Sequence, residues 1–240
     1  MQQNWISQIL KRFSPDVVVI TGDIFESQNY LFSIRYDIEF NPYKILSEIF
    51  GDIPVICTLG NHEFWYLDVK ETIIFYTERY DPKLYNVHYL DIIDSIDIDE
   101  FTFLGNVLWY DGSLGYEGQD IDSFADSKWG DCQIENFNWK KENKKCVKKI
   151  LNVKTDKTKI LCTHCVPHND LNGWKDELDH SKQKAFDAYS GMRDFLKFVK
   201  PKWAFCGHSH LRRCLEIDDC NCVNCGNDYR PPHLYFTGEI

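Results

Sequence analysis

The stretch Ile53-Pro54-Val55-Ile56-Cys57-Thr58-Leu59-Gly60-Asn61-His62-Glu63 sets a short apolar run directly before a polar cluster. A run of this kind, without alternation, is typical of a strand that is buried on both faces. Ligand sites in sheets of parallel strands gather where the strands end, because the loops that follow meet at one edge. The stretch therefore predicts an α/β protein with a site at the carboxyl ends of its strands.

Three further apolar runs in the chain are followed at once by small polar clusters. Each run indicates another buried strand. Histidine, aspartate and the asparagine carbonyl bind first-row divalent metals, and a set without thiolate suits Mn²⁺, Fe²⁺, Zn²⁺ or Ni²⁺. One such cluster alone would be an ordinary turn, but four in one chain predict a metal site. The further clusters are Gly22-Asp23, Thr163-His164 and Gly207-His208-Ser209-His210.

The rest of the pattern alternates helical spacing with short strands. We expect one domain over residues 1–240, with a loop or helical insertion around 112–150 and a Cys-rich turn around 214–225. The expected elements are helices over 3–13, 42–50, 68–80, 139–151 and 182–199, antiparallel strands or hairpins over 87–109, a long loop over 112–138, and strands from 211 to 240.

Composition narrows the class of protein. The chain has 240 residues, 43% of them hydrophobic, which is enough for a sizeable core. Its formal net charge of -10 at pH 7 argues against non-specific binding to anionic membranes or nucleic acid, so a nucleic-acid partner is left open but not favoured. No apolar run approaches the roughly 20 residues that span a bilayer, and the start lacks the pattern of a signal peptide. We expect a cytoplasmic protein that acts without a membrane.

The order of the polar clusters resembles the calcineurin-like metallophosphoesterase family. Its members carry, in order, Asp-x-His, Gly-Asp, Gly-Asn-His-Asp/Glu, a later His, and Gly-His-x-His. Four of these five motifs stand here between Gly22 and His210, and Phe103–Trp109 is similar to a segment in the middle of many members. The resemblance implies a two-sheet β-sandwich flanked by helices, with two metal ions at the strand ends.

The resemblance also implies a role for each matching residue. Asp23 would bridge both metals. His62 would not bind metal but would lie over the substrate phosphate, stabilise the developing charge and protonate the leaving oxygen. Glu26, three residues beyond Asp23, stands where members often place the carboxylate that orients this histidine. One metal would be completed by Asn61, His164 and His208, and the other would take His210.

The implied activity is hydrolysis of a phosphate mono- or diester, on a small-molecule or nucleotide substrate. Two cations would hold the phosphate and lower the pKa of a bound water toward neutrality. The resulting hydroxide would attack phosphorus in line with the ester oxygen. The imidazole, held by a carboxylate, would supply charge and a proton.

One family motif is missing, because no Asp-x-His precedes Gly22. The family's first strand, which carries that motif, has no counterpart here. Either the chain is a fragment, or it is a variant that has lost one metal site. The other metal would then have only Asp23 and His210, so we expect one bound metal or low activity. A catalytically impaired scaffold or binding protein of the same fold is the alternative function.

The chain contains ten cysteines, and four of them crowd together near the end. Without a signal peptide, metal binding or reduced thiols are favoured over disulfides. Four thiolates could hold one structural zinc, although a single residue between two ligands is tight. A structural zinc and reduced thiols on a hairpin are both open interpretations for Cys214, Cys220, Cys222 and Cys225.

Overall fold

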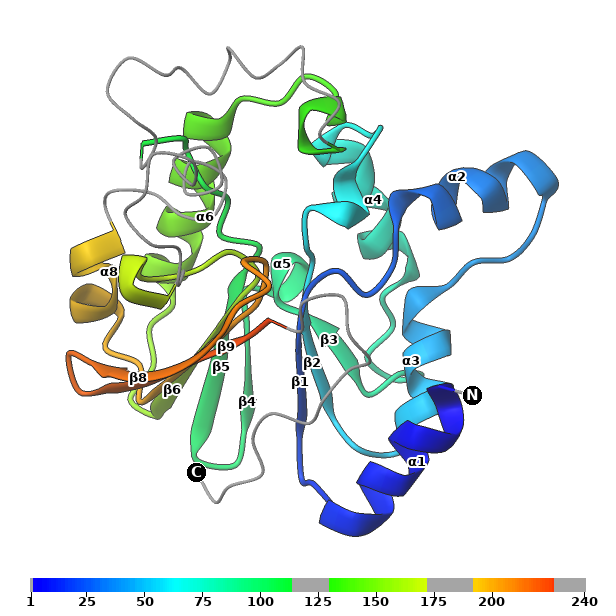
Figure 1. The fold of residues 1–240 in the computed structure, drawn as a ribbon. Coiled ribbons are helices and arrows are strands. Elements are labelled where there is room, and N and C mark those ends of the chain that lie inside the picture. Colours follow the sequence, from blue (N-terminus) through cyan, green and yellow to red (C-terminus); the bar gives the residue numbers. More distant parts are fainter. Residues whose placement is uncertain (1, 114–129, 172–191, 227–240) are drawn as a thin grey trace.

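The computed structural model describes residues 2–113, 130–171 and 192–226. Figure 1 shows two sheets lying side by side with helices on their outer sides. The predicted α/β architecture, a two-sheet β-sandwich flanked by helices, is therefore confirmed. The carboxyl ends of the parallel strands point toward the top of Figure 1.

The first sheet contains three parallel strands, β1 (Val18–Thr21), β2 (Val55–Thr58) and β3 (Val87–Tyr89), in that order. All four residues of β2 are buried, whereas all four of β1 are half-buried. The difference follows from position, because β1 lies at the edge of the sheet and pairs, within the described part of the chain, with β2 alone.

The second sheet has six strands and combines both kinds of pairing. Its central strands run parallel, and a hairpin forms each margin. Its order is β4 (Ser95–Ile98), β5 (Phe101–Asn106), β6 (Thr158–Thr163), β7 (Trp203–Cys206), β9 (Cys220–Cys225), β8 (Arg212–Ile217).

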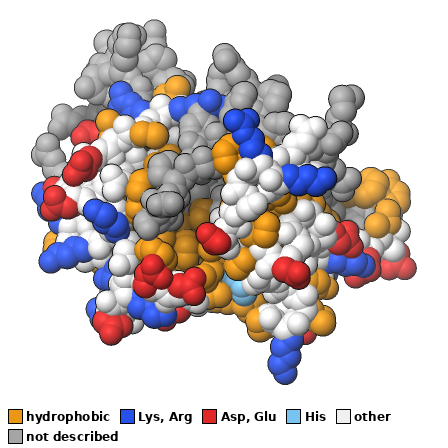
Figure 2. Space-filling model, turned by 90° about the horizontal axis from the view of Figure 1, so that it is seen from below, with side chains coloured by type: hydrophobic (Ala, Val, Ile, Leu, Met, Phe, Trp, Pro, Cys, Tyr) orange, Lys and Arg blue, Asp and Glu red, His pale blue; other side chains and the backbone are white. Residues whose placement is uncertain are grey.

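The core between the sheets takes side chains from both of them. Ile56 of β2 lies in one cluster with Ile160 of β6 and Phe205 of β7. Seen from below, hydrophobic side chains show between charged ones (Figure 2). Val17, just before β1, and Phe101, the first residue of β5, are partly buried and pack against this core. Apolar side chains therefore gather at the amino ends of the strands, and the polar clusters follow their carboxyl ends.

Helices cover the outer face of each sheet. On the first sheet, Tyr43 of α3 (Pro42–Phe50) and Phe75 of α4 (Val69–Arg79) pack in one cluster. On the second, Ile150 of α6 (Trp139–Asn152) and Phe195 of α8 (Met192–Val199) pack against Leu161 of β6. The remaining helices are α1 (Gln2–Phe13), α2 (Ser27–Tyr36), α5 (Leu90–Ile93) and the 3₁₀ turns η1 (His62–Phe64), η3 (Gly130–Gln133) and η4 (Asn169–Leu171).

Local sequence explains where the covering helices begin. Asn41 caps α3 by accepting hydrogen bonds from the backbone N–H groups of Tyr43 and Lys44, and Pro42 occupies the first turn, where no N–H is needed. Asp68 caps α4 in the same way. None of the helices in the described ranges is both long and apolar enough to cross a membrane.

The structure corrects two expectations about these elements. The sequence predicts antiparallel strands or hairpins over residues 87–109, and β4 and β5 do form a hairpin, but β3 pairs in parallel with β2. The strands predicted around the Cys-rich segment are present as β8 and β9, but the four cysteines lie within these strands and not in a turn. Within the expected insertion, α6 is one of the helices that cover the second sheet, and residues 114–129 lie outside the described residues.

We predict that Gly105→Ala destabilises the protein by at least about 3 kcal/mol. Gly105 of β5 has φ 152°, and a Cβ there would come 1.7 Å from the carbonyl oxygen of Cys162 on β6. Gly51→Ala is the control, because Gly51 has φ 63° but nothing within 4 Å of an added Cβ. Because Gly51 also has ψ −129°, a conformation that is strained for residues with a Cβ, the control should cost about 1–3 kcal/mol, less than the added clash at Gly105. Equal losses in urea unfolding would contradict the prediction.

Candidate metal centre

Three side chains from different strand ends meet at the carboxyl edge of the sandwich. Asn61 follows β2, His164 follows β6 and His208 follows β7. The Asn61 Oδ1 atom lies 2.8 Å from His164 Nε2 and 3.1 Å from His208 Nδ1, and the two imidazole nitrogens are 3.1 Å apart. The structure thus brings together three of the ligands that the sequence predicts for one metal.

The spacing of these three atoms matches ligands on one cation. Bonds of about 2.1 Å from a first-row metal place two ligands at right angles about 3 Å apart. The described residues contain no group of three or more His, Cys, Asp or Glu side chains that could hold an ion. The converging set differs from such a group because one of its three members is the amide oxygen of Asn61.

The hydrogen bonds around His164 and Asn61 test whether a cation fits. His164 Nδ1 lies 2.7 Å from the carbonyl oxygen of Thr21, which only accepts, so Nδ1 carries the proton. The Asn61 amide nitrogen donates to Asp131 over 2.6 Å, which turns Oδ1 toward the imidazoles. His164 Nε2 can then face the Asn61 oxygen in two ways: with a second proton, which it would donate to that oxygen, or with a lone pair, in which case a cation must lie between the two atoms. A divalent cation fits this donor set.

Asp23 borders this set from the end of β1. Its Oδ1 lies 3.5 Å from His164 Nε2, and about a quarter of its side chain is exposed. Burial acts to raise the pKa of Asp23, but the imidazoles of His164, His62 and His208 outweigh it and hold the pKa below its usual value. The carboxylate is thus kept ionised, as a metal ligand must be.

The backbone at the strand ends is unusual. Asp23, His208 and His210 have φ values of 52°, 60° and 55°, in the left-handed region that few non-glycine residues adopt. Gly22, before Asp23, has φ 84°, and a Cβ on it would come 2.4 Å from His164 Nδ1. Strain of this kind gathers at functional sites and persists where surrounding contacts enforce it.

His62 lies next to the convergent set without belonging to it. Its Nε2 is 3.8 Å from Asp23 Oδ2, and its ring packs on Trp65 with 3.6 Å between ring centroids. About a fifth of the side chain is exposed, at 21%. An imidazole that is held in place but still reached by solvent can meet a substrate, as the sequence predicts for His62.

The structure does not join Glu26 to His62. Glu26 is exposed at the start of α2, does not cap that helix, and its side chain forms no hydrogen bond or ion pair with the described residues. The ring of His62 is supported by Trp65 instead. The orienting role of Glu26 thus has no contact to support it.

Glu63 is the carboxylate that the site is built on, although sequence reasoning gave it no role. It is 2% exposed. Its oxygens accept from four backbone N–H groups, those of Asp23, Ile24, Phe25 and Gly60, at 2.7–3.2 Å. Burial, and then the charge of Asp23, act to raise the pKa of Glu63, while the backbone donors favour its ionised form and oppose the rise. Its place in the quoted Gly-Asn-His-Glu motif was the signal that could have revealed it.

Asp131 of η3 is a second residue that sequence reasoning missed. It is 6% exposed and accepts hydrogen bonds from Asn61, Trp65 and Tyr110. The pattern of residues 112–138 predicts a loop, and a lone Gly-Asp pair within a polar segment carries no periodic or motif signal. Its role becomes visible only once the chain is folded.

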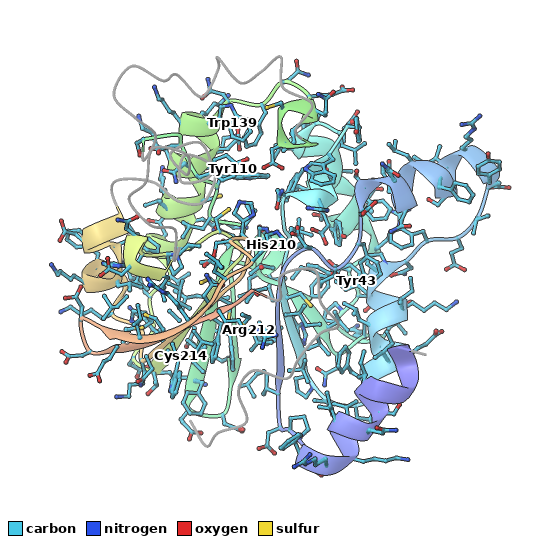
Figure 3. All side chains as sticks on the ribbon, viewed as in Figure 1. Tyr43, Tyr110, Trp139, His210, Arg212 and Cys214 are labelled. Carbon is cyan, nitrogen blue, oxygen red and sulfur yellow. The ribbon has the colours of Figure 1, made fainter. Side chains whose placement is uncertain are left out.

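His210 lies two residues after His208, beyond the end of β7, and is half-buried. Figure 3 shows it near the tops of the strands, at the same edge as the convergent set. This position agrees with a place at the rim of the site, and its assignment to a second metal stays a prediction.

The four clustered cysteines do not meet at one point. Cys220 and Cys222, with 3.6 Å between their sulfur atoms, pack in the cluster that α6 and α8 cover. Cys225 packs in the core between the sheets, and Cys214 pairs in register with Val223 of that same core. The sheet separates the two pairs, so the four thiolates cannot share one zinc. All ten cysteines are free thiols.

Comparison with known proteins agrees with this geometry. The family model described as calcineurin-like phosphoesterase matches residues 2–212. The chain belongs to the calcineurin-like phosphoesterase family. Membership implies hydrolysis of phosphoesters, and members generally bind divalent metals. No protein with a curated description matches the chain.

Solved structures share the fold at low sequence identity. The phosphopantetheinyl hydrolase PptH from Mycobacterium tuberculosis is similar with a TM-score of 0.63 and 14% identity, over 86% of this chain and 77% of that one. The protein TT1561 of Thermus thermophilus is similar with a TM-score of 0.51 and 12% identity, over 94% of this chain and 83% of that one. At these identities the likeness shows the fold.

We predict that Glu63→Gln destabilises the metal-free protein by about 2–4 kcal/mol. Each oxygen of Glu63 accepts two backbone N–H groups, so an amide nitrogen in either position leaves two of these donors without an acceptor. The measurement is urea unfolding without metal. Glu26→Gln is the matched control on an exposed carboxylate and should change stability by less than about 0.5 kcal/mol. A Glu63 variant as stable as the wild type would refute the prediction.

Proposed function

We propose that this chain hydrolyses a phosphate mono- or diester with a divalent metal held by Asn61, His164, His208 and Asp23. The observation that supports this most directly is the convergence of Asn61 Oδ1, His164 Nε2 and His208 Nδ1 within 2.8–3.1 Å of one another. Lone pairs of these three atoms can point at one cation, and the resemblance to the family implies metal ions at the strand ends.

A bound divalent cation would draw charge from the phosphate and lower the pKa of a water toward neutrality. The chain's own residues would provide the remaining functions. Thr21 and Asp131 keep the metal-binding atoms of His164 and Asn61 turned toward the site. His62, held on Trp65 beside Asp23, would stabilise the developing charge and give a proton to the leaving oxygen.

The ligand atoms indicate which metal ion would bind. Nitrogen and oxygen ligands suit Mn²⁺, and also Fe²⁺, Zn²⁺ or Ni²⁺. For these 240 residues we expect one tightly held metal per chain, because among them only Asp23 and His210 match the family's ligands for a second. A phosphate ester of a small molecule or nucleotide is the proposed substrate, and a cytoplasmic location stays a prediction.

We predict Mn²⁺-dependent hydrolysis of bis-p-nitrophenyl phosphate or p-nitrophenyl phosphate, which also separates diesterase from monoesterase activity. His164→Ala and Asn61→Ala should each lower turnover by at least about 100-fold, since losing a ligand costs more than the 10–100-fold typical of its supporting residues. His88→Asn is the matched control, a buried histidine on β3 that bonds Tyr80 and Asn86. It should retain turnover.

Binding measured by equilibrium dialysis separates the proposal from its alternative. Mn²⁺ should bind the wild type once per chain and raise its Tm, and the ligand variants should lose both effects. Mn²⁺ binding without turnover of either ester would favour a scaffold of the same fold. Two tightly held metals per chain would contradict the expected stoichiometry.

A further inference from the structure

Asp131 gathers three side-chain donors on one buried carboxylate. Its Oδ1 accepts from Asn61 Nδ2 and from Trp65 Nε1, each over 2.6 Å, and its Oδ2 accepts from the Tyr110 hydroxyl over 2.7 Å. The residue is 6% exposed. All three bonds are charge-assisted and lie away from bulk water, so they are stronger than ordinary hydrogen bonds.

Each of the three donors touches a different member of the candidate site. Asn61 presents its Oδ1 to both imidazoles of the convergent set. The Trp65 ring packs on His62 with 3.6 Å between centroids. The Tyr110 ring, labelled in Figure 3, stacks on His208 with 5.7 Å between centroids and 22° between ring planes. One carboxylate therefore reaches a ligand directly and two other site residues through aromatic rings.

We propose that Asp131 is a positioning residue that sets the orientation of Asn61, His62 and His208. This inference rests on the proposed function, because it assigns those three residues to the site. It extends that function by adding a residue from a segment, 130–135, that contains none of the family motifs.

The effect on Asn61 follows from the two ends of its amide. Only the nitrogen can donate to Asp131, so the bond forces the oxygen toward His164 and His208. The two ends have almost the same shape, and without Asp131 nothing steric prevents the amide from turning round. A turned amide would aim N–H groups at a cation, which repels them. Loss of such a supporting group typically costs 10–100-fold in metal affinity.

The backbone holds the segment of Asp131 in place independently of its side chain. The carbonyl of Gln133 accepts from Tyr66 N–H, and Glu135 N–H donates to the Leu67 carbonyl, each at 3.0 Å. An isolated parallel bridge joins Glu135 to Asp68. These bonds tie residues 133–135 to the loop that follows His62. A change of the Asp131 side chain should therefore leave the segment attached and the protein folded.

The test compares two variants of similar shape. In Asp131→Asn, the amide oxygen can still accept from Asn61 and Trp65, while its nitrogen donates to the Tyr110 hydroxyl. In Asp131→Leu all three bonds are lost. We expect Asp131→Leu to weaken Mn²⁺ binding by 10–100-fold, against less than about 5-fold for Asp131→Asn. Affinity is measured by competition with a fluorescent chelator, and urea unfolding without metal checks that both variants fold.

A spectroscopic readout and a third variant complete the test. In Asp131→Leu the Trp65 indole N–H resonance, assigned with Trp65→Phe, should move, and in Asp131→Asn it should stay near its original shift. Wild-type Mn²⁺ affinity in a folded Asp131→Leu would overturn the positioning role, and so would equal losses in both variants. Asn61→Ala separates the two hypotheses: if it binds Mn²⁺ like the wild type, the proposed metal site itself fails.

Discussion

The convergence of four backbone N–H groups on the buried carboxylate of Glu63 is the constraint on which the candidate site depends. Those groups belong to the loops after β1 and β2, two adjacent parallel strands. A hydrogen-bonded sheet fixes the strands themselves but leaves the direction of the following loops open. Glu63 fixes the direction of these loops, because its two oxygens accept hydrogen bonds from both the loop that contains Asp23 and the loop that contains Asn61. The left-handed conformation of Asp23 is held in part by these bonds.

The edge of the sheet that these bonds hold in place brings several nitrogen and oxygen acceptor atoms close together. The Asn61 Oδ1 atom lies 2.8 Å from His164 Nε2, and the carboxylate of Asp23 lies 3.5 Å from the same imidazole nitrogen. When His164 carries its only proton on Nδ1, these acceptor atoms face one another without a donor between them, which is unfavourable. The arrangement is favourable once a positive charge lies among them. Rigidity around the site, here supplied by Glu63 and Asp131, is what keeps the acceptors from moving apart.

The fold and the convergent set could be predicted because both are encoded at strand ends. Each apolar run ends in its polar cluster within one or two residues, and parallel strands bring those ends to one edge. Asn61, His164 and His208 were found in this way. The helix α2 was not, since its pattern misleads: Ser33 is buried while Phe32 and Ile34 are 55% and 61% exposed. No amphipathic stripe marks such a helix.

The parts of the site that escaped prediction are contacts between segments with no common motif. The family resemblance implied Glu26, three residues after Asp23, as the partner of His62. The fold turns Glu26 outward at the start of α2 and brings Trp65 to His62 instead. Asp131 reaches Asn61 across 70 positions of sequence, a pairing that no local pattern encodes.

The residues that orient ligands all act on the ligands of one metal position. Asn61 is turned by Asp131, His164 by the Thr21 carbonyl, and His208 is covered by the Tyr110 ring. Preorganised ligands bind a metal without paying the entropy of ordering, whereas for a position built from Asp23 and His210 the described residues show no comparable third ligand. If a second ion binds, it should therefore do so only after the first, with Asp23 shared between them. Ordered filling of this kind would make activity rise with metal concentration in two steps.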